Sequence, residues 1–261
     1  MTAELVREAI ELPAGRRQVV FRSGDGPPLV WLHGVDGIQP GHPIVDALAD
    51  RYSVVAPLAP GFDDLADVED VDDVHDLAIH YDDVLGALGL AGVPMVGHSI
   101  GGMIAAELAA HFPQRVGRLV LLAPLGLWRD DEPVADMFAV RFPELPDLLF
   151  ADRAVAERVL PGTAAELDVE THVRRAQAMT TVAKFTWPIP DNGLRRRLYR
   201  IAAPTLVVFG ELDALVPASY ADDFVAGISN ARKVVIPGAG HMVPVERPAE
   251  VLAATLEFLG S

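Results

Sequence analysis

The sequence contains no cysteine among its 261 residues. This absence excludes a disulfide framework, a thiolate nucleophile and a thiolate metal site. Long apolar runs are missing as well. No stretch reaches the roughly 18 apolar residues of a membrane-spanning helix, and the first twenty residues carry six charged side chains in place of an apolar signal region. We therefore expect a cytoplasmic protein with no membrane partner.

Basic residues are scarce. The chain has 21 Lys and Arg against 37 Asp and Glu, which gives a formal net charge of −16. Nucleic acid carries the same sign of charge, so we expect no nucleic-acid partner. Many of the acidic residues lie between Asp63 and Asp83. The EF-hand spacing with its central glycine is missing there, so this stretch is interpreted as a solvated loop and helix face.

Clusters of histidine and carboxylate residues at metal-ligand spacing are also missing from the sequence. We therefore expect the protein to use neither a metal ion nor a cofactor.

Short apolar runs alternate with amphipathic segments along most of the chain. This rhythm predicts a single α/β domain with a mostly parallel central sheet and helices on both faces. Helices are predicted over residues 44–49, 71–90, 103–111 and 248–258. Strands are predicted over residues 8–12, 18–22, 28–32, 52–56, 93–96, 118–123, 205–209 and 233–236.

The rhythm breaks between residues 125 and 203, which contain scattered prolines and two of the three tryptophans. We predict a core of residues 1–124 and 204–261, with residues 125–203 inserted as a helical cap, or lid, over the carboxyl edge of the sheet. Ligands bind at that edge in open α/β folds. The cap aromatics Phe138, Phe142 and Trp187 either line a substrate pocket or simply dock the cap, and the sequence leaves both readings open.

The most informative segment is Gly97-His98-Ser99-Ile100-Gly101, which follows an apolar run and precedes a predicted helix. A serine on such a sharp strand-to-helix turn has its hydroxyl exposed above the sheet. Glycines flank it because a Cβ does not fit where strand and helix pass so closely. Ser99 is thus a candidate nucleophile, and the free amides at the start of the helix face any negative charge that develops there.

A serine nucleophile needs a base and a carboxylate that orients the base. His241 lies in a glycine-rich loop after the last predicted strand, and Asp213 follows the strand before it. Glu211 follows the same strand as Asp213 and is the competing acid. We favour Asp213 because a turn can point its side chain back across the sheet edge.

The order Ser99, Asp213, His241 is that of the α/β-hydrolases. The sequence resembles that superfamily over nearly its whole length, including His33-Gly34 and the Glu246 and Pro248 that follow His241.

The resemblance implies the α/β-hydrolase fold, with Ser99 as nucleophile, His241 as base and Asp213 as orienting acid. It further implies an oxyanion hole formed by the amides of Val35 and Ile100. Candidates for the substrate pocket are His33, Gly34, Phe138, Phe142, Trp187 and Met242.

The preferred function is hydrolysis of a small, largely apolar ester or related acyl substrate by a monomer or homodimer. Serine at position 99 argues against epoxide hydrolases and haloalkane dehalogenases, which form an ester on a carboxylate. The C–C bond hydrolases of aromatic ring cleavage usually carry Gly-Pro-Gly in the oxyanion loop and Trp after the histidine. This sequence has Val35-Asp36-Gly37 and Met242 there. C–C hydrolysis, cofactor-free perhydrolysis and ligand binding by a non-catalytic receptor remain the alternatives.

Overall fold

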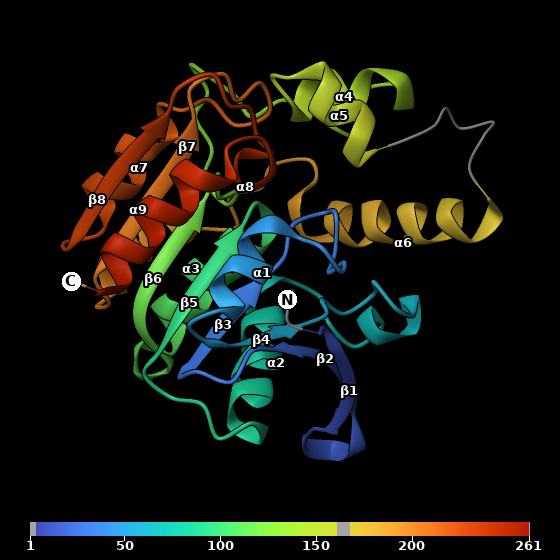
Figure 1. Cartoon of the computed structure of the whole chain (residues 1–261), viewed down its shortest axis with the longest axis vertical. Helices are drawn as coiled ribbons and strands as arrows, with labels where there is room; N and C mark the ends of the chain where they lie inside the picture. The colour runs from blue at the N-terminus through green and yellow to red at the C-terminus, as the bar shows by residue number, and fades with distance from the viewer. Residues whose placement is uncertain (1–3, 161–167, 261) are drawn as a thin grey trace.

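The computed structural model describes residues 4–160 and 168–260. One eight-stranded sheet runs through the molecule in the order β1-β2-β4-β3-β5-β6-β7-β8 (Figure 1). The six strands β4, β3, β5, β6, β7 and β8 are parallel to one another. β2 pairs antiparallel with both β1 and β4. The carboxyl ends of the parallel strands therefore meet at one edge of the sheet. The strands are β1 Val6–Glu11, β2 Arg17–Ser23, β3 Pro28–Leu32, β4 Ser53–Pro57, β5 Val93–His98, β6 Val116–Leu122, β7 Thr205–Gly210 and β8 Ala231–Ile236.

Helices cover both faces of this sheet. α1 (Pro43–Ala49) and α9 (Pro248–Gly260) pack together on one face, and α2 (Val74–Ala87) and α3 (Ile100–His111) pack together on the other (Figure 1). α7 (Tyr220–Gly227) packs on β7 and β8, and α8 (Val243–Glu246) leads into α9. The predicted fold class, a mostly parallel sheet between two helical layers, is confirmed.

Residues 125–203, called the inserted segment below, leave the sheet after β6 and return at β7. Their described part contains α4 (Leu145–Leu149), α5 (Arg153–Val159) and α6 (Val169–Thr186), and no strand. In Figure 1 these three helices lie beyond one edge of the sheet. Directly before the segment, the Ala123 amide donates to the carbonyl of Val208 at 2.7 Å and extends the pairing of β6 with β7. Short 3-10 helices occur at Pro13–Gly15, Leu65–Val68, Pro113–Arg115, Phe142–Glu144, Leu194–Arg196 and Leu198–Arg200.

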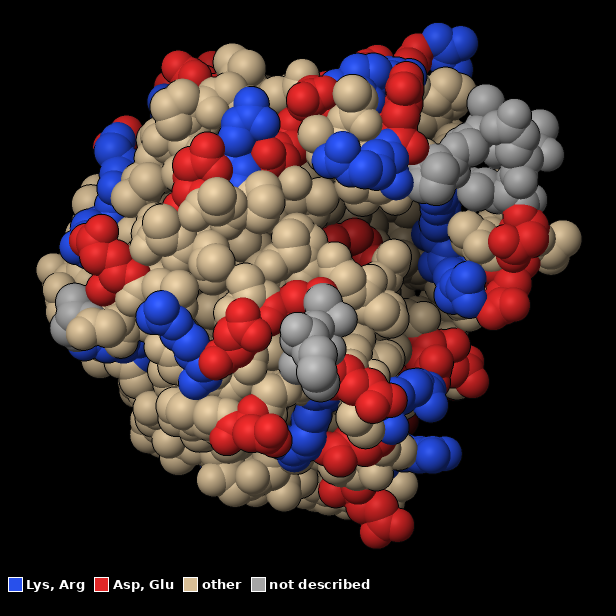
Figure 2. Space-filling model, viewed as in Figure 1, with Lys and Arg blue, Asp and Glu red and all other residues tan. Residues whose placement is uncertain are grey.

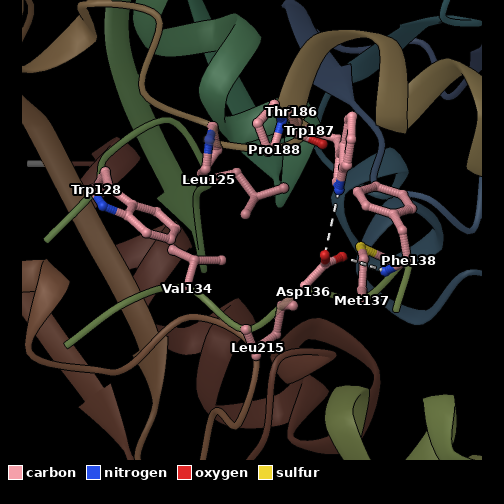
Figure 3. Close-up of a pocket in the computed structure, with 12 residues that line it drawn as sticks. Leu125, Trp128, Val134, Asp136, Met137, Phe138, Thr186, Trp187, Pro188 and Leu215 are labelled. Carbon is pink, nitrogen blue, oxygen red and sulfur yellow. Dashed lines mark hydrogen bonds between the residues drawn. The ribbon is translucent and has the colours of Figure 1, made fainter. Parts of the chain in front are cut away.

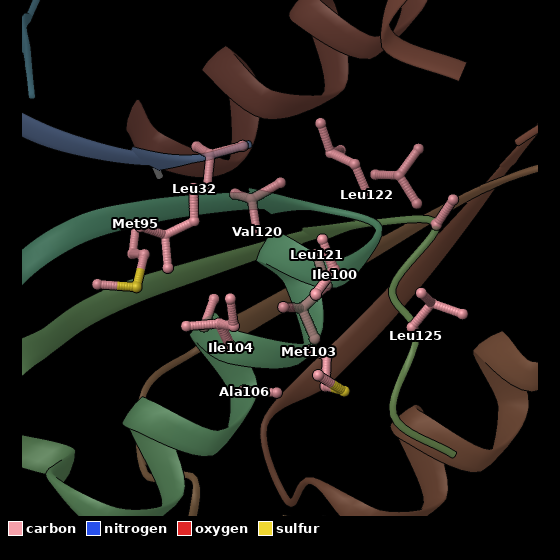
Figure 4. Close-up of a cluster of buried hydrophobic side chains, with 14 of the residues drawn as sticks. Leu32, Met95, Ile100, Met103, Ile104, Ala106, Val120, Leu121, Leu122 and Leu125 are labelled. Carbon is pink, nitrogen blue, oxygen red and sulfur yellow. The ribbon is translucent and has the colours of Figure 1, made fainter. Parts of the chain in front are cut away.

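The core is densest around the central strands. Met95 and Val120 have no exposed surface, and Ile100 and Met103 of α3 pack beneath them (Figure 4). Burying a side chain of this size stabilises the fold by about 1.5–3 kcal/mol. The turn between β5 and α3 is therefore supported by tightly packed side chains.

The boundaries of several elements differ from those predicted. β5 continues through His98 and α3 begins at Ile100, so only Ser99 separates strand from helix. Helix α2 begins at Val74, later than predicted, because the carboxylate of Asp73 caps it by accepting the amides of His75 and Asp76 at 2.7 and 3.0 Å.

The acidic surface is interleaved with basic side chains. On the face seen in Figure 2, Lys and Arg lie among Asp and Glu rather than in a separate patch. Arg16 pairs with Asp83 and Arg115 with Asp82, both in α2. Part of the acidic stretch is thus neutralised locally.

His80 of α2 makes the stability of the fold sensitive to acid. Its Nε2–H donates to Gln18 Oε1 at 2.7 Å, and its Nδ1 faces the guanidinium of Arg16 at 3.4 Å, so the ring must be neutral. Burial, assisted by the charge of Arg16, lowers the pKa of His80 to about 4. Between about 6.5 and 4 the unfolded chain therefore binds a proton that the folded protein does not, and stability falls as the pH falls through this window.

We expect His80→Gln to remove this contribution. Urea unfolding at pH 7 and pH 4.5 should show an acid-induced loss of stability that is smaller in the variant by roughly 2 kcal/mol. An equal loss in the two proteins would contradict the prediction.

Candidate active site

Ser99 occupies a strained turn between β5 and α3. Its φ of 55° and ψ of −118° lie where residues other than glycine are rarely found. Three backbone hydrogen bonds hold it there. The Ser99 amide donates to Leu122 O at 2.9 Å, and the Ser99 carbonyl accepts the amides of Met103 and Leu125, both at 3.1 Å. The surrounding structure thus determines a conformation that costs about 1–3 kcal/mol in isolation.

The glycines around Ser99 are required by close backbone contacts. A Cβ on Gly97 would lie 2.4 Å from the carbonyl oxygen of Gly101, and a Cβ on Gly101 would lie 2.2 Å from that of Leu32. Strand and helix therefore approach each other as the Gly-x-Ser-x-Gly pattern predicts.

Ser99, His241 and Asp213 form one continuous chain of hydrogen bonds. His241 Nε2 lies 2.8 Å from Ser99 Oγ, and His241 Nδ1 lies 2.9 Å from Asp213 Oδ2. The carboxylate can only accept, so Nδ1 carries the ring proton of the neutral imidazole, which leaves Nε2 free to accept the serine proton. All three residues are buried, and His241 is only 1% exposed.

Asp213 is oriented by its own turn. Its Oδ1 accepts the amides of Leu215 and Val216 at 3.0 and 2.8 Å, which leaves Oδ2 directed at His241. Glu211, the competing acid, is exposed and accepts the amide of Gly238 at 3.0 Å. The structure therefore brings Asp213 to His241 and leaves Glu211 at the surface.

Two further histidines fix the loops around this chain. His98 Nε2–H donates to the carbonyl of His241 at 3.1 Å, and burial lowers the pKa of His98 to about 4, so its ring is neutral. His33 Nδ1–H donates to Gly34 O at 2.7 Å, and its Nε2 accepts the amide of Ala59 at 2.9 Å. Burial also lowers the pKa of His33. Both rings hold backbone in place.

Val35 lies in the loop after β3, and Ile100 is the first residue of α3, directly after Ser99. Val35 is in a turn closed by the Gly37 amide and the Gly34 carbonyl at 3.2 Å. This turn passes so close to the end of β5 that a Cβ on Gly34 would lie 2.7 Å from His98 Nδ1. Ile100 begins α3, and the first amides of a helix have no intrahelical acceptor.

A cavity of about 190 Å³ is lined by residues next to this hydrogen-bonded chain, although Ser99, Asp213 and His241 themselves are not among them (Figure 3). Two of the residues that line the cavity are hydrogen-bonded to members of this chain. Leu125 donates its amide to the Ser99 carbonyl, and Leu215 donates its amide to Asp213. The lining is largely apolar, with Trp128 and Phe138 among its residues, and residues 128–138 and 186–190 supply most of it.

One carboxylate and one indole close a side of the cavity. Trp187 Nε1–H donates to Asp136 Oδ2 at 3.3 Å, drawn as a dashed line in Figure 3. This bond joins the two parts of the inserted segment that line the cavity, although 59% of Trp187 remains exposed.

Of the pocket candidates, Phe138 and Trp187 line this cavity, whereas the other four do not. The ring of Phe142 lies under the guanidinium of Arg175 on α6, 5.5 Å from its centroid. Met242 is buried, with its amide bonded to Leu149 O at 2.9 Å. His33 and Gly34 are buried in the loop after β3, where the His33 ring packs on Phe62.

The cavity lining also includes residues that no sequence pattern predicts. Leu125 and Leu215 have no sequence signal beyond their hydrophobicity, and Trp128 is one of several aromatic residues in the inserted segment. Within residues 4–160 and 168–260, no three or more His, Asp or Glu side chains are placed to hold a metal ion. None of the helices in these ranges is long and apolar enough to cross a membrane.

Comparison with known proteins gives relatives with different reactions. The pimeloyl-[acyl-carrier protein] methyl ester esterase of Aeromonas hydrophila is 28% identical over 254 residues, which cover 92% of this chain and 98% of the esterase. The 2-hydroxy-6-oxo-6-phenylhexa-2,4-dienoate hydrolase of Burkholderia cepacia is 27% identical over 265 residues, which cover 92% of this chain and 90% of that enzyme.

Solved structures with a similar fold are also found. The crystal structure of naproxen esterase from Bacillus subtilis superposes with a TM-score of 0.75 at 21% identity, covering 98% of this chain and 92% of the esterase. The sequence profile of the alpha/beta hydrolase family matches residues 27–255. The chain therefore belongs to the alpha/beta hydrolase family.

Proposed function

We propose that the protein is a serine hydrolase that cleaves carboxylic esters of a small, largely apolar substrate. The observation that carries this proposal is the chain Asp213–His241–Ser99, whose two hydrogen bonds measure 2.9 and 2.8 Å. Nucleophile, base and orienting acid are in contact in the order that acyl transfer requires. A pure binding protein would not need this arrangement.

In the first step Ser99 Oγ attacks the ester carbonyl while His241 Nε2 takes the hydroxyl proton. The imidazolium then gives this proton to the departing alkoxide, so an alcohol leaves and an acyl-serine remains. In the second step His241 removes a proton from water, which attacks the acyl group, and the imidazolium then returns that proton to Ser99 Oγ as the acid leaves. Asp213 Oδ2 accepts the Nδ1–H throughout and stabilises the transient positive ring.

The negative oxygen that forms on the carbonyl carbon needs donors. We assign the amides of Val35 and Ile100 to this role, because Ile100 directly follows the nucleophile at a helix start and Val35 lies in the turn packed against His98. Loss of one such donor typically costs about 10²- to 10³-fold in kcat.

The cavity lined by Leu125, whose amide bonds the Ser99 carbonyl, supports a preference for apolar groups of modest size. Its volume of about 190 Å³ is comparable to that of apolar cavities of about 150 Å³ that hold benzene. We assign it to the acyl group of the substrate, with residues 125–203 acting as the cap. We therefore expect esters of ring-containing or short-chain acids to be better substrates than those of long-chain acids.

Hydrolysis of a C–C bond is the second candidate, because the Burkholderia relative is a dienoate hydrolase and is nearly as similar as the esterase. A panel of substrates separates the two. We expect turnover of p-nitrophenyl acetate, butyrate and benzoate, slower turnover of the palmitate, and little of a vinylogous 1,5-diketone. EDTA should leave the rate unchanged because the attacking group is the Ser99 hydroxyl.

If the protein cleaves the diketone faster than every ester, its proposed function becomes C–C bond hydrolysis. Turnover that appears only with hydrogen peroxide as acceptor would favour a perhydrolase. Tight binding of a small molecule without any turnover would identify a receptor.

A further inference from the structure

Glu246 is a buried carboxylate that bonds three backbone amides from two distant parts of the chain. It ends α8 and is only 5% exposed. Its Oε2 accepts the amide of Gly240 at 2.7 Å, and its Oε1 accepts the amides of Ala151 and Asp152 at 2.9 and 2.8 Å. Burial of a charged group is tolerated where hydrogen bonds of this kind replace its hydration.

The first of these amides belongs to the residue directly before His241. The other two belong to the junction between α4 and α5 in the inserted segment. On the other side of His241, the Met242 amide donates to Leu149 O at 2.9 Å. Both neighbours of His241 are therefore attached to residues 149–152.

Gly240 allows this attachment. A Cβ at this position would lie 2.7 Å from the amide nitrogen of Ala151 and 3.0 Å from Glu246 Oε2. The loop that carries His241 thus lies directly against the α4–α5 junction, and Glu246 joins the two across that contact.

We propose that Glu246 is a positioning residue, which holds His241 in reach of Ser99 by fastening the Gly240 amide to the α4–α5 junction. The geometry of the base then depends on the placement of the inserted segment. This inference rests on the proposed function, because it assigns His241 the role of base. Glu246 itself bonds only backbone amides in these contacts, so we assign it no part in proton transfer.

The variant Glu246→Gln tests this directly. A glutamine amide has one acceptor oxygen and one NH₂ group, which cannot accept a hydrogen bond. Turning its oxygen toward Ala151 and Asp152 satisfies two donors and leaves the NH₂ group facing the Gly240 amide. The bond to the His241 loop is lost while the bond to the inserted segment is retained.

We expect Glu246→Gln to lower kcat by about 10- to 100-fold, the size of effect that a displacement of roughly 1 Å produces at a catalytic group. KM for p-nitrophenyl butyrate should stay within about threefold, because Glu246 does not line the cavity. Rates are to be expressed per Ser99 titrated with a fluorophosphonate, so that unfolded protein does not contribute. The rate constant of that labelling should fall in parallel with kcat.

Glu211→Gln is the matched control, because Glu211 also accepts one amide of this loop but is exposed, and that amide belongs to Gly238, which is not adjacent to His241. We expect its kcat to stay within about threefold of the unchanged protein. Glu246→Asp is the second variant in case glutamine impairs folding. It keeps the buried charge but is one methylene too short to reach both sides, so its kcat should also fall.

Normal kcat per titrated Ser99 in both Glu246 variants would overturn the positioning role, as would an equal loss in Glu211→Gln. The proposed function fails separately, if the unchanged protein neither turns over esters nor reacts with the fluorophosphonate at Ser99.

Discussion

Replacing Ser99 by alanine is expected to lower kcat for ester hydrolysis by about 10⁴- to 10⁶-fold. The variant keeps the cavity and the amides of Val35 and Ile100, so the small rate that remains is what binding and oxyanion stabilisation provide without a nucleophile. The fold should persist, because alanine also has a Cβ and the three backbone hydrogen bonds of the turn do not involve the hydroxyl.

The measurement pairs steady-state kinetics with thermal unfolding of Ser99→Ala and the unchanged protein. Peptide mass spectrometry after fluorophosphonate treatment supplies the direct check, with an adduct on Ser99 of the unchanged protein and none in the variant. An adduct on another residue, or a variant that retains more than about a tenth of the activity, would remove Ser99 from the role of nucleophile.

Asp213→Asn is expected to cost on the order of 10⁴-fold in kcat. The asparagine oxygen can retain the two amides that Asp213 Oδ1 accepts, from Leu215 and Val216. Its NH₂ group then faces His241 Nδ1 and donates to it. The ring must place its proton on Nε2, opposite Ser99, where it can no longer accept the serine proton.

Glu211→Gln is the comparison for this variant as well. The exposed Glu211 contacts Gly238 rather than His241, so its loss should cost no more than about threefold. The two variants thus separate by roughly three orders of magnitude. A severe loss in Glu211→Gln with nearly normal Asp213→Asn would exchange the two assignments.

The sheet and the three residues of the hydrogen-bonded chain could be anticipated from the sequence for one physical reason. Apolar runs long enough for strands alternate with helices, and such a rhythm leaves a parallel sheet as the arrangement that buries both. Ser99, Asp213 and His241 each follow a different strand of it, and the carboxyl ends of parallel strands share an edge. Their separations of 142 and 28 residues along the chain are then no obstacle.

The cavity and the role of Glu246 depend on contacts that leave no local pattern. Glu246 lies 95 and 94 residues from Ala151 and Asp152, and its partners there are backbone amides, which every residue except proline provides. Phe142 was an equally plausible lining residue from its aromatic character alone. Its packing against Arg175 depends on how α6 lies beside it.

The inserted segment is the crossover connection between two parallel strands, and this has an evolutionary consequence. Because β6 and β7 are parallel, the segment leaves β6 at the carboxyl edge of the sheet and enters β7 at the opposite edge, where Thr205 pairs with Leu119. A replacement of different length or sequence that spans the same two points would leave the strands that carry Ser99, Asp213 and His241 in place. We therefore expect the substrate range to change more readily than the proposed chemistry. Any replacement must still offer backbone donors to Glu246 and an acceptor to the Met242 amide.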